Sequence, residues 1–253
     1  MHYLDSQAPN SPVINRERFK GYPEHVHDNL ELVLIESGTR EVYIRGKKYT
    51  EPPGSLTVVF PFLPHSYPDS PDAVYAWVGV SPRFLPGIEE LLGYVPESPV
   101  IEAGRLGRHT VLVEYLFGCP RDTRAATLNA LAAALVSELS EELSLKKREF
   151  SSVGCEVLSV LAAHCHENDF SLEALSKLTG IAARELAGFF RASFGMTFGA
   201  FLRKYRLDNA ISMLAMRGKS ITEIAFESGF SSVRTFNRVF REEFGVSPSE
   251  YRK

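Results

Sequence analysis

Three histidines and a glutamate near the start of the chain have the residue types and spacing of a metal site. His25 and His27 are two residues apart, so on a β-strand their side chains would project to the same side. Together with Glu31 and His65 they offer imidazole nitrogens and a carboxylate, a ligand set suited to a divalent transition metal. The same four side chains could instead be the polar lining of a pocket for a small molecule, and the sequence leaves both interpretations open.

A second set of polar residues, close to the C-terminus, has the types and spacing needed to read DNA bases. Arg234, Asn237 and Arg238 occupy positions i, i+3 and i+4, which places them on one side of a helix. In the major groove, arginine pairs with guanine and asparagine with adenine. The plain alternative is a solvated helix face, because Arg and Asn are common on the outside of helices.

An internal repeat favours the DNA-reading interpretation. When the C-terminal part is aligned with itself, Ser171 falls on Ser220 and Gly180 falls on Gly229. The serines are candidate N-caps, and Ser220 with Glu223 three residues later would form a capping box. The glycines would supply the sharp turn between two helices, where a positive φ is tolerated without a Cβ. The repeat therefore predicts two consecutive helix-turn-helix units.

The first unit is poorer in polar side chains than the second. By the repeat, Gly188 occupies the position of Arg238, and its neighbours on the exposed face are Arg184 and Ala187. We therefore expect the first unit to read bases weakly, through Arg184 and apolar contacts, or mainly to grip phosphates.

One long helix over residues 198–218 is expected between the two units. Its length of about 27–30 Å is close to the ~34 Å between successive major-groove faces, so one chain could place two recognition helices in adjacent turns of DNA. Several polar residues could contact phosphates, although a solvated face explains the long helix equally well. These residues are Arg203, Lys204, Arg206, Ser231 and Ser232.

The elements that position these residues change character along the chain. The first ~100 residues predict short strands separated by Gly and Pro turns, which indicates a barrel or sandwich. Residues 123–145 then predict one amphipathic helix, and helices follow a linker at residues 149–154. Packing onto its own domain and a dimer-forming helix pair both explain the leucine stripe of the first helix, which comprises Leu128, Leu131, Leu135, Leu139 and Leu143.

Composition limits the class of protein only loosely. The 253 residues carry a net charge of −3, which does not by itself suggest a nucleic-acid-binding protein. Residues 151–253 are the more basic part, with 13 Lys and Arg against 11 Asp and Glu. Three scattered cysteines argue against a disulfide framework, and neither a signal peptide nor a membrane span is expected. These features predict a cytoplasmic protein that does not associate with membranes.

At the repeat, the sequence resembles the AraC/XylS family of bacterial transcription regulators. The resemblance covers about residues 153–253 and is carried mainly by the run from Ser220 to Lys253. Ala187 and Gly188 depart from the family pattern, in which polar residues are frequent at these positions. The resemblance implies a bipartite seven-helix DNA-binding domain, with promoter DNA and RNA polymerase as partners, and a homodimer.

The N-terminal part resembles the cupin-like sensory domains often attached to this family. The spacing His-x-His-x₃-Glu-x₆-Gly joins His25, His27, Glu31 and Gly38, and His65 follows in a Pro-rich turn that is less faithful to the second cupin motif. The fold class expected is multidomain α+β. Its parts are a cupin-like β-barrel sensory domain (1–118), a helical linker that would serve dimerisation (119–152) and an all-α, AraC-type DNA-binding domain with two helix-turn-helix units (153–253).

These resemblances imply a sequence-specific DNA-binding transcriptional regulator that responds to a small molecule or metal held by the barrel, and not an enzyme. One alternative is a cupin enzyme with iron or manganese at the His/Glu cluster. Another is a protein-interaction module in which the tandem helices bind a protein partner. Turnover of a small substrate would favour the first alternative, and salt-dependent binding to promoter DNA would exclude the second.

Overall fold

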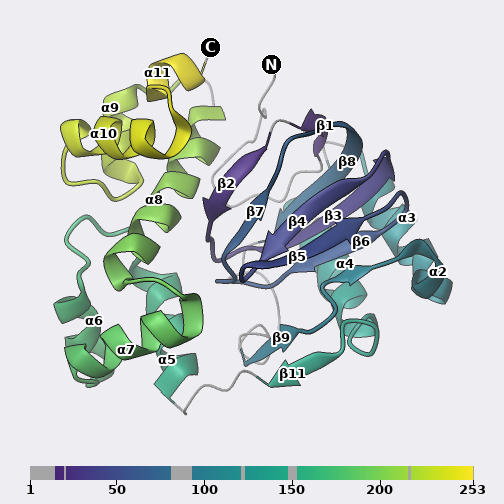
Figure 1. Ribbon diagram of the computed structural model, residues 1–253, viewed down its shortest axis with the longest axis horizontal. Helices are drawn as coiled ribbons and strands as arrows, with labels where there is room; N and C mark the ends of the chain where they lie inside the picture. Colours follow the sequence, from purple (N-terminus) through teal and green to yellow (C-terminus); the bar gives the residue numbers. More distant parts are fainter. Residues whose placement is uncertain are drawn as a thin grey trace. The chain divides into compact units, whose positions relative to one another are not determined.

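The computed structural model describes residues 15–19, 21–80, 93–120, 123–147, 153–215 and 218–252. The chain divides into two compact units, built mainly from residues 28–149 and 150–253. Strands dominate the first unit, drawn in purple to teal in Figure 1, and helices dominate the second, drawn in green to yellow. None of the helices within the described ranges is long and apolar enough to cross a lipid bilayer.

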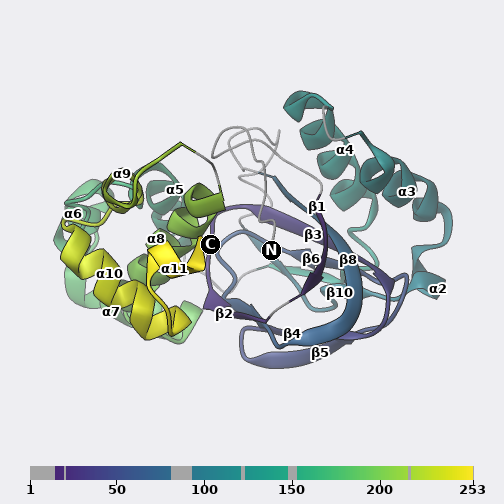
Figure 2. The ribbon, with the colours of Figure 1, turned by 90° about the horizontal axis from the view of Figure 1, so that it is seen from above.

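The two larger sheets of the first unit have strands that curve around a common interior (Figure 2). A five-stranded sheet has the order β1-β8-β3-β6-β10, and a four-stranded sheet has the order β2-β7-β4-β5. Short strands separated by turns were expected here, and the β-rich fold confirms that expectation. The strands are β1 (Asn15–Phe19), β2 (Tyr22–His25), β3 (Leu30–Ser37), β4 (Arg40–Ile44), β5 (Lys47–Glu51), β6 (Leu56–Val59), β7 (His65–Tyr67), β8 (Ser70–Val80) and β10 (Val100–Ile101).

The turn between β3 and β4 requires a glycine. Gly38 has a φ of 71°, and a Cβ at this position would lie 2.4 Å from the carbonyl oxygen of Asp72. Both the left-handed backbone and the close approach of Asp72 exclude a side chain. This explains in physical terms why the motif that begins at His25 ends in glycine.

The helices of the first unit pack into the same core as its strands. They are α2 (Ala103–Leu106), the short 3₁₀ helix η2 (Gly107–His109), α3 (Thr110–Gly118) and α4 (Ala125–Glu138). Of the leucine stripe, Leu131 is partly buried and the other four members are fully or almost fully buried in the core that also contains Leu32 and Val58. The stripe therefore packs onto its own domain, as the simpler interpretation held.

The expectation of one helix over residues 123–145 is wrong in extent. Helix α4 ends at Glu138, and Leu145 already belongs to β11 (Leu145–Lys147). This strand pairs antiparallel with β9 (Tyr94–Pro96), and Ser144 just before it has a φ of 50°. Backbone hydrogen bonds to β9 replace those that a continued helix would have made.

The second unit is helical throughout its described residues. Its elements are α5 (Val153–His164), α6 (Leu172–Thr179), α7 (Ala183–Phe194), α8 (Phe198–Ala215), α9 (Ile221–Glu227), α10 (Val233–Phe244) and α11 (Pro248–Tyr251). The pairs α6–α7 and α9–α10 are the two helix-turn-helix units, and α8 joins them. With 18 residues, α8 is about 27 Å long.

The caps and turns expected from the repeat are confirmed. The Ser171 side chain accepts a hydrogen bond from the N–H of Ala174 at the start of α6. Ser220 and Glu223 form a capping box at the start of α9. Gly180 and Gly229 have φ values of 69° and 94°, so each turn uses the left-handed backbone that glycine allows.

Candidate effector site and DNA interface

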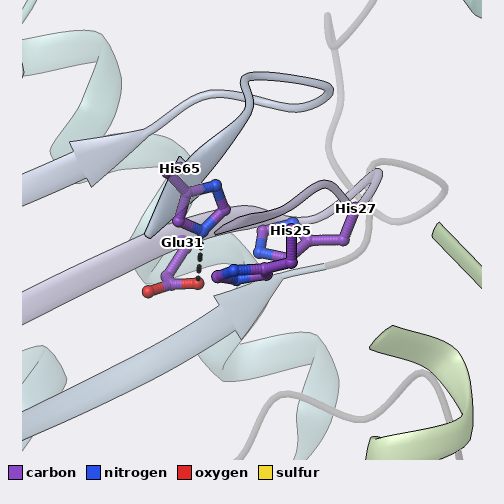
Figure 3. Close-up of side chains that lie close together, drawn as sticks. All are labelled: His25, His27, Glu31 and His65. Carbon is purple, nitrogen blue, oxygen red and sulfur yellow. Dashed lines mark ion pairs between the residues drawn. The ribbon is translucent and has the colours of Figure 1, made fainter. Parts of the chain in front are cut away.

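The three histidines and the glutamate come together in the first candidate site (Figure 3). Their ligand atoms all lie within 4.8 Å of one another, and the four residues are buried. His25 ends β2, Glu31 lies in β3 and His65 begins β7, while His27 lies two residues after the end of β2. The four side chains thus come from three strands and one connecting segment, which bring their nitrogen and oxygen atoms into one cluster.

The environment of His65 fixes which of its ring nitrogens carries the hydrogen. Nδ1 of His65 lies 2.8 Å from the carbonyl oxygen of Leu63. A carbonyl can only accept, so Nδ1–H donates, and in the neutral ring Nε2 carries the lone pair. That Nε2 atom lies 3.6 Å from Oε2 of Glu31. Nε2 of His65 and Oε2 of Glu31 thus both direct lone pairs at the same space, an arrangement that a cation or a proton between them would stabilise.

A buried polar network holds Glu31 from the other side. The Tyr67 hydroxyl donates a hydrogen bond of 2.6 Å to Oε1 of Glu31. Burial, and then the charge of Glu31, raise the pKa of Tyr67 well above its ordinary value, so the phenol remains a donor. Over the Tyr67 ring, at 4.2 Å from its centroid, lies the guanidinium carbon of Arg40.

Arg40 is itself held by a fully buried acidic partner. Its Nε and Nη2 atoms donate to the Glu51 carboxylate over 2.6 Å and 3.0 Å. Burial acts to lower the pKa of Arg40, but the charge and hydrogen bonds of Glu51, together with the charges of Tyr67 and Glu31, raise that pKa above its ordinary value. The Thr57 hydroxyl also donates to Glu51. The network thus connects Glu51 through Arg40 and Tyr67 to the candidate metal ligand Glu31.

Tyr67, Arg40 and Glu51 were missed from the sequence, although one signal pointed to Arg40. In β4 the buried positions are Arg40, Val42 and Ile44, so the arginine is in phase with the apolar residues. Period-two alternation places all three on the same inward face. A charged side chain on the buried face of a strand needs a partner of opposite charge, so the position of Arg40 predicts a buried acidic residue beside it.

The four clustered residues fit a divalent metal. A metal bound at about 2.0–2.2 Å brings ligand atoms to within about 3–4 Å of one another. The cluster, with a maximum separation of 4.8 Å, needs only small side-chain shifts to reach such distances. The bonds from His65 Nδ1 to Leu63 and from Tyr67 to Glu31 also resemble the outer-shell contacts that orient metal ligands.

Aromatic residues that could have lined a pocket are mostly part of the core. Phe60, Phe62 and Tyr75 are buried, and Trp77 packs against a small apolar cluster around Tyr75. Tyr43 is the exception, because it lines, together with Tyr67, a hollow of about 460 Å³. The hollow is bounded by Gly21, Tyr22, Pro23, Glu24, Tyr43, Ser66, Tyr67, Pro68 and Asp69.

The second candidate site is the outer face of α10. Arg234, Asn237 and Arg238 are exposed, while Phe236 and Phe240 on the opposite face are buried. Arg238 is ion-paired with Glu242 one turn later, at 2.7 Å. The sequence therefore folds into an amphipathic helix that presents two guanidinium groups and one amide together.

The corresponding face of α7 has fewer polar groups. Arg184 and Gly188 are exposed and Ala187 is half-buried. A Cβ added to Gly188 would meet no atom within 4 Å, so this position is open space on the helix surface. The structure thus retains the asymmetry between the two units that the sequence predicts.

The side chains considered as phosphate contacts differ in the hydrogen bonds and ion pairs that they already make within the protein. Ser232 is the N-cap of α10, and its hydroxyl oxygen accepts a bond from the N–H of Thr235, whereas Ser231 is exposed. Lys204 is ion-paired with Glu243 of α10 at 3.2 Å. Arg206 donates to the carbonyl oxygen of Glu167. Lys204 therefore links α8 to α10, and Arg206 links α8 to the segment after α5. Of the three α8 cations considered as phosphate contacts, Arg203 is the exposed one.

The two recognition helices occupy comparable places in the helical unit. Figures 1 and 2 show α7 and α10 near opposite ends of α8 and displaced toward the same side of it. The length of α8, about 27 Å, sets their separation. This is the arrangement expected for two helices that enter successive major grooves.

Comparison with known proteins agrees with both parts of this description. Residues 12–152 match the family model of the AraC-like ligand binding domain, and residues 175–253 match a helix-turn-helix domain. The transcriptional activator RhaS of Enterobacter sp. is 27% identical over 281 residues, covering 100% of this chain and 96% of the relative. RhaR of Klebsiella pneumoniae is 27% identical over 271 residues, covering 99% and 94%.

The fold has a counterpart among solved structures. Fatty-acid-bound ToxT from Vibrio cholerae superimposes with a TM-score of 0.67 at 18% sequence identity, covering 96% of this chain and 95% of ToxT. Together, the two matched domains define a DNA-binding transcription regulator with an N-terminal ligand-binding domain. The chain belongs to the AraC family of transcriptional regulators, and the interpretation as a cupin enzyme is set aside because this is a family of regulators, not of enzymes.

Proposed function

We propose that this regulator reads a bipartite promoter site, and that a small molecule or divalent metal in the N-terminal domain changes how it does so. The observation that carries the proposal is the exposed triad on α10, opposite a buried aromatic face. Arg234, Asn237 and Arg238 would contact base edges in one major groove. In the neighbouring groove the contacts would come from Arg184, Ala187 and Gly188 of α7. Ser231 and Ser232, at the start of α10, would contact phosphates.

The effector would bind in the β-rich domain. His25, His27, Glu31 and His65 would hold a divalent metal, which would offer a Lewis-acidic position to an oxygen or nitrogen atom of a small molecule. Without metal, the same side chains would line the effector pocket as hydrogen-bonding groups. ToxT, whose fold this chain shares, has been solved with an unsaturated fatty acid bound, which supports a small-molecule role for this domain.

The partners follow from this function. Promoter DNA and RNA polymerase would be the macromolecular partners, and the site of action would be the cytoplasm. We also propose a homodimer that forms through the β-rich domain or α4. Because most of the leucine stripe is buried in its own core, a dimer contact on α4 would have to use other residues of the helix.

In vitro selection of DNA by the purified full-length protein tests the proposal, with one arm in excess ZnCl₂ and one in EDTA. A two-part consensus with salt-dependent affinity supports the DNA role, and the absence of any enriched sequence overturns it. A change in affinity between the arms that is lost in His27→Ala supports a metal effector. Equal affinity in both arms contradicts the metal as the effector.

A further inference from the structure

Arg206, near the middle of α8, contacts both the segment that leads into the first helix-turn-helix unit and the turn of the second unit. Its Nη2 donates a 2.5 Å hydrogen bond to the carbonyl oxygen of Glu167, and its Nε lies 3.5 Å from the carbonyl oxygen of Cys165. Both carbonyls belong to the segment between α5 and α6, at the entrance to the first unit. Burial lowers the pKa of Arg206, which an arginine tolerates without losing its charge.

On its other side the same guanidinium abuts the turn of the second unit. A Cβ added to Gly229 would lie 2.7 Å from Nε and 3.2 Å from Cδ of Arg206. The same Cβ would lie 3.1 Å from the carbonyl oxygen of His166, which belongs to the segment between α5 and α6. The turn between α9 and α10 is thus packed directly against the segment that leads into the first unit, with the Arg206 side chain as part of the contact.

The turn glycines of the two units differ in the reasons that exclude a side chain. Gly180 has a positive φ, but a Cβ there would meet no atom within 4 Å. Gly229 has both a positive φ and the close contact with Arg206. The first glycine serves its own turn alone, whereas the second also permits close packing against Arg206 and the segment before the first unit.

We propose that Arg206 is a positioning residue that fixes the two helix-turn-helix units relative to each other, and so sets the spacing of the two DNA subsites that the protein accepts. The guanidinium suits this role because its planar fork can donate to more than one carbonyl in a fixed geometry. The ion pair from Lys204 to Glu243 adds a second link, between α8 and α10. The proposal rests on the bipartite DNA reading proposed above.

The test uses the DNA site selected by the full-length wild-type protein, with derivatives that have one base pair inserted or deleted between the two halves. Wild type should bind the selected spacing at least about tenfold more tightly than either derivative. In Arg206→Met this ratio should fall to about threefold or less, because a specificity is a ratio of affinities and the units can then adjust independently. Arg206→Lys should lie between the two, since one ammonium cannot replace the fork.

The matched control is Arg203→Met, three residues earlier on α8, where the arginine is exposed. It should lower affinity for all three DNAs by the same factor, as expected for a phosphate contact. Gly229→Ala, which pushes on Arg206, should lower the spacing ratio, whereas Gly180→Ala should lower thermal stability only. Because the ratio is normalised within each variant, a loss of folded protein alone does not change it.

Unchanged spacing discrimination in Arg206→Met overturns the proposal, and so does an equal loss of affinity on selected and random DNA. If Arg206→Met does not fold, the spacing ratio of Arg206→Lys is compared with that of wild type, and an unchanged ratio overturns the proposal. Failure of the wild type to select a two-part site would instead contradict the proposed function. The two failures are therefore distinguishable.

Discussion

The hydroxyl of Tyr67, which shares strand β7 with His65, donates to Glu31 over 2.6 Å in a buried position. This bond leaves one carboxylate oxygen of Glu31 directed toward His65, at 3.6 Å from its Nε2. Tyr67 thus orients the acidic member of the cluster without being a ligand itself.

Tyr67→Phe should weaken divalent metal binding by about tenfold or more, the usual effect of removing an outer-shell hydrogen bond. Titration calorimetry with ZnCl₂ on the purified protein measures the change. Tyr43→Phe is the matched control, because Tyr43 lines the same hollow as Tyr67. Equal affinity in wild type and Tyr67→Phe would show that Glu31 is oriented by other contacts.

Arg40→Met should destabilise the β-rich domain by about 3–5 kcal/mol, because it leaves the buried carboxylate of Glu51 without its cation. The double variant Arg40→Met/Glu51→Leu should recover most of this loss, since both charges are then removed from the core. Urea denaturation of the three proteins measures the free energies of unfolding. A double variant as unstable as the single one would show that Arg40 stabilises chiefly by packing between Tyr67 and Tyr75.

Arg238→Ala should reduce discrimination at one base pair of the selected site by about 1–3 kcal/mol, the usual worth of a bidentate contact to guanine. Competition binding with single-base variants of the site measures this. Glu242→Gln is the companion variant, because it removes the ion partner of Arg238 and a negative charge near the DNA. It should raise affinity for all DNA while retaining base discrimination. A loss in Arg238→Ala that is equal on specific and random DNA would assign Arg238 to phosphate.

Gly188→Ala should stabilise the helical domain by about 0.5–1 kcal/mol, because an alanine restricts the unfolded chain and no atom lies within 4 Å of the new Cβ. Gly188→Arg places on α7 the residue type that α10 has at Arg238. It should tighten DNA binding and enrich a guanine in the half-site read by α7. Thermal unfolding and repeated site selection measure the two effects, and an unaltered consensus would show that α7 contacts only the backbone.

The helical domain could be predicted from the sequence in considerable detail, because its signals are local. Ser220 with Glu223, and the glycines at 180 and 229, each specify a cap or turn through neighbouring residues alone. The exposed face of α10 follows from helical periodicity in the same way. For Arg206 the sequence leaves open a phosphate contact or a solvated face, and misses its actual role, because its acceptor carbonyls at Cys165 and Glu167 come from a distant segment that no local pattern identifies.

The β-rich domain could be predicted less completely, because its contacts join residues that are remote in sequence. The His/Glu cluster was found because three of its members share one short motif, and the structure brings the fourth to them. The end of the helix at Glu138 was missed, since the strand pairing of Leu145 with Pro96 competes with helical propensity from far along the chain. The role of Tyr67 as the hydrogen-bond donor to Glu31 depends on the folded position of β7, because Glu31 lies 36 residues earlier in β3.

If α7 and α10 read DNA as proposed, their unequal outer faces would give the protein a fixed direction on its site. One face carries two arginines and an asparagine, and the other carries a single arginine beside a bare glycine. A site read in this way is not palindromic, so a single chain can lie on it in only one direction. Reversing the site in a promoter would therefore turn the whole regulator around, and with it whichever surface meets the transcription machinery.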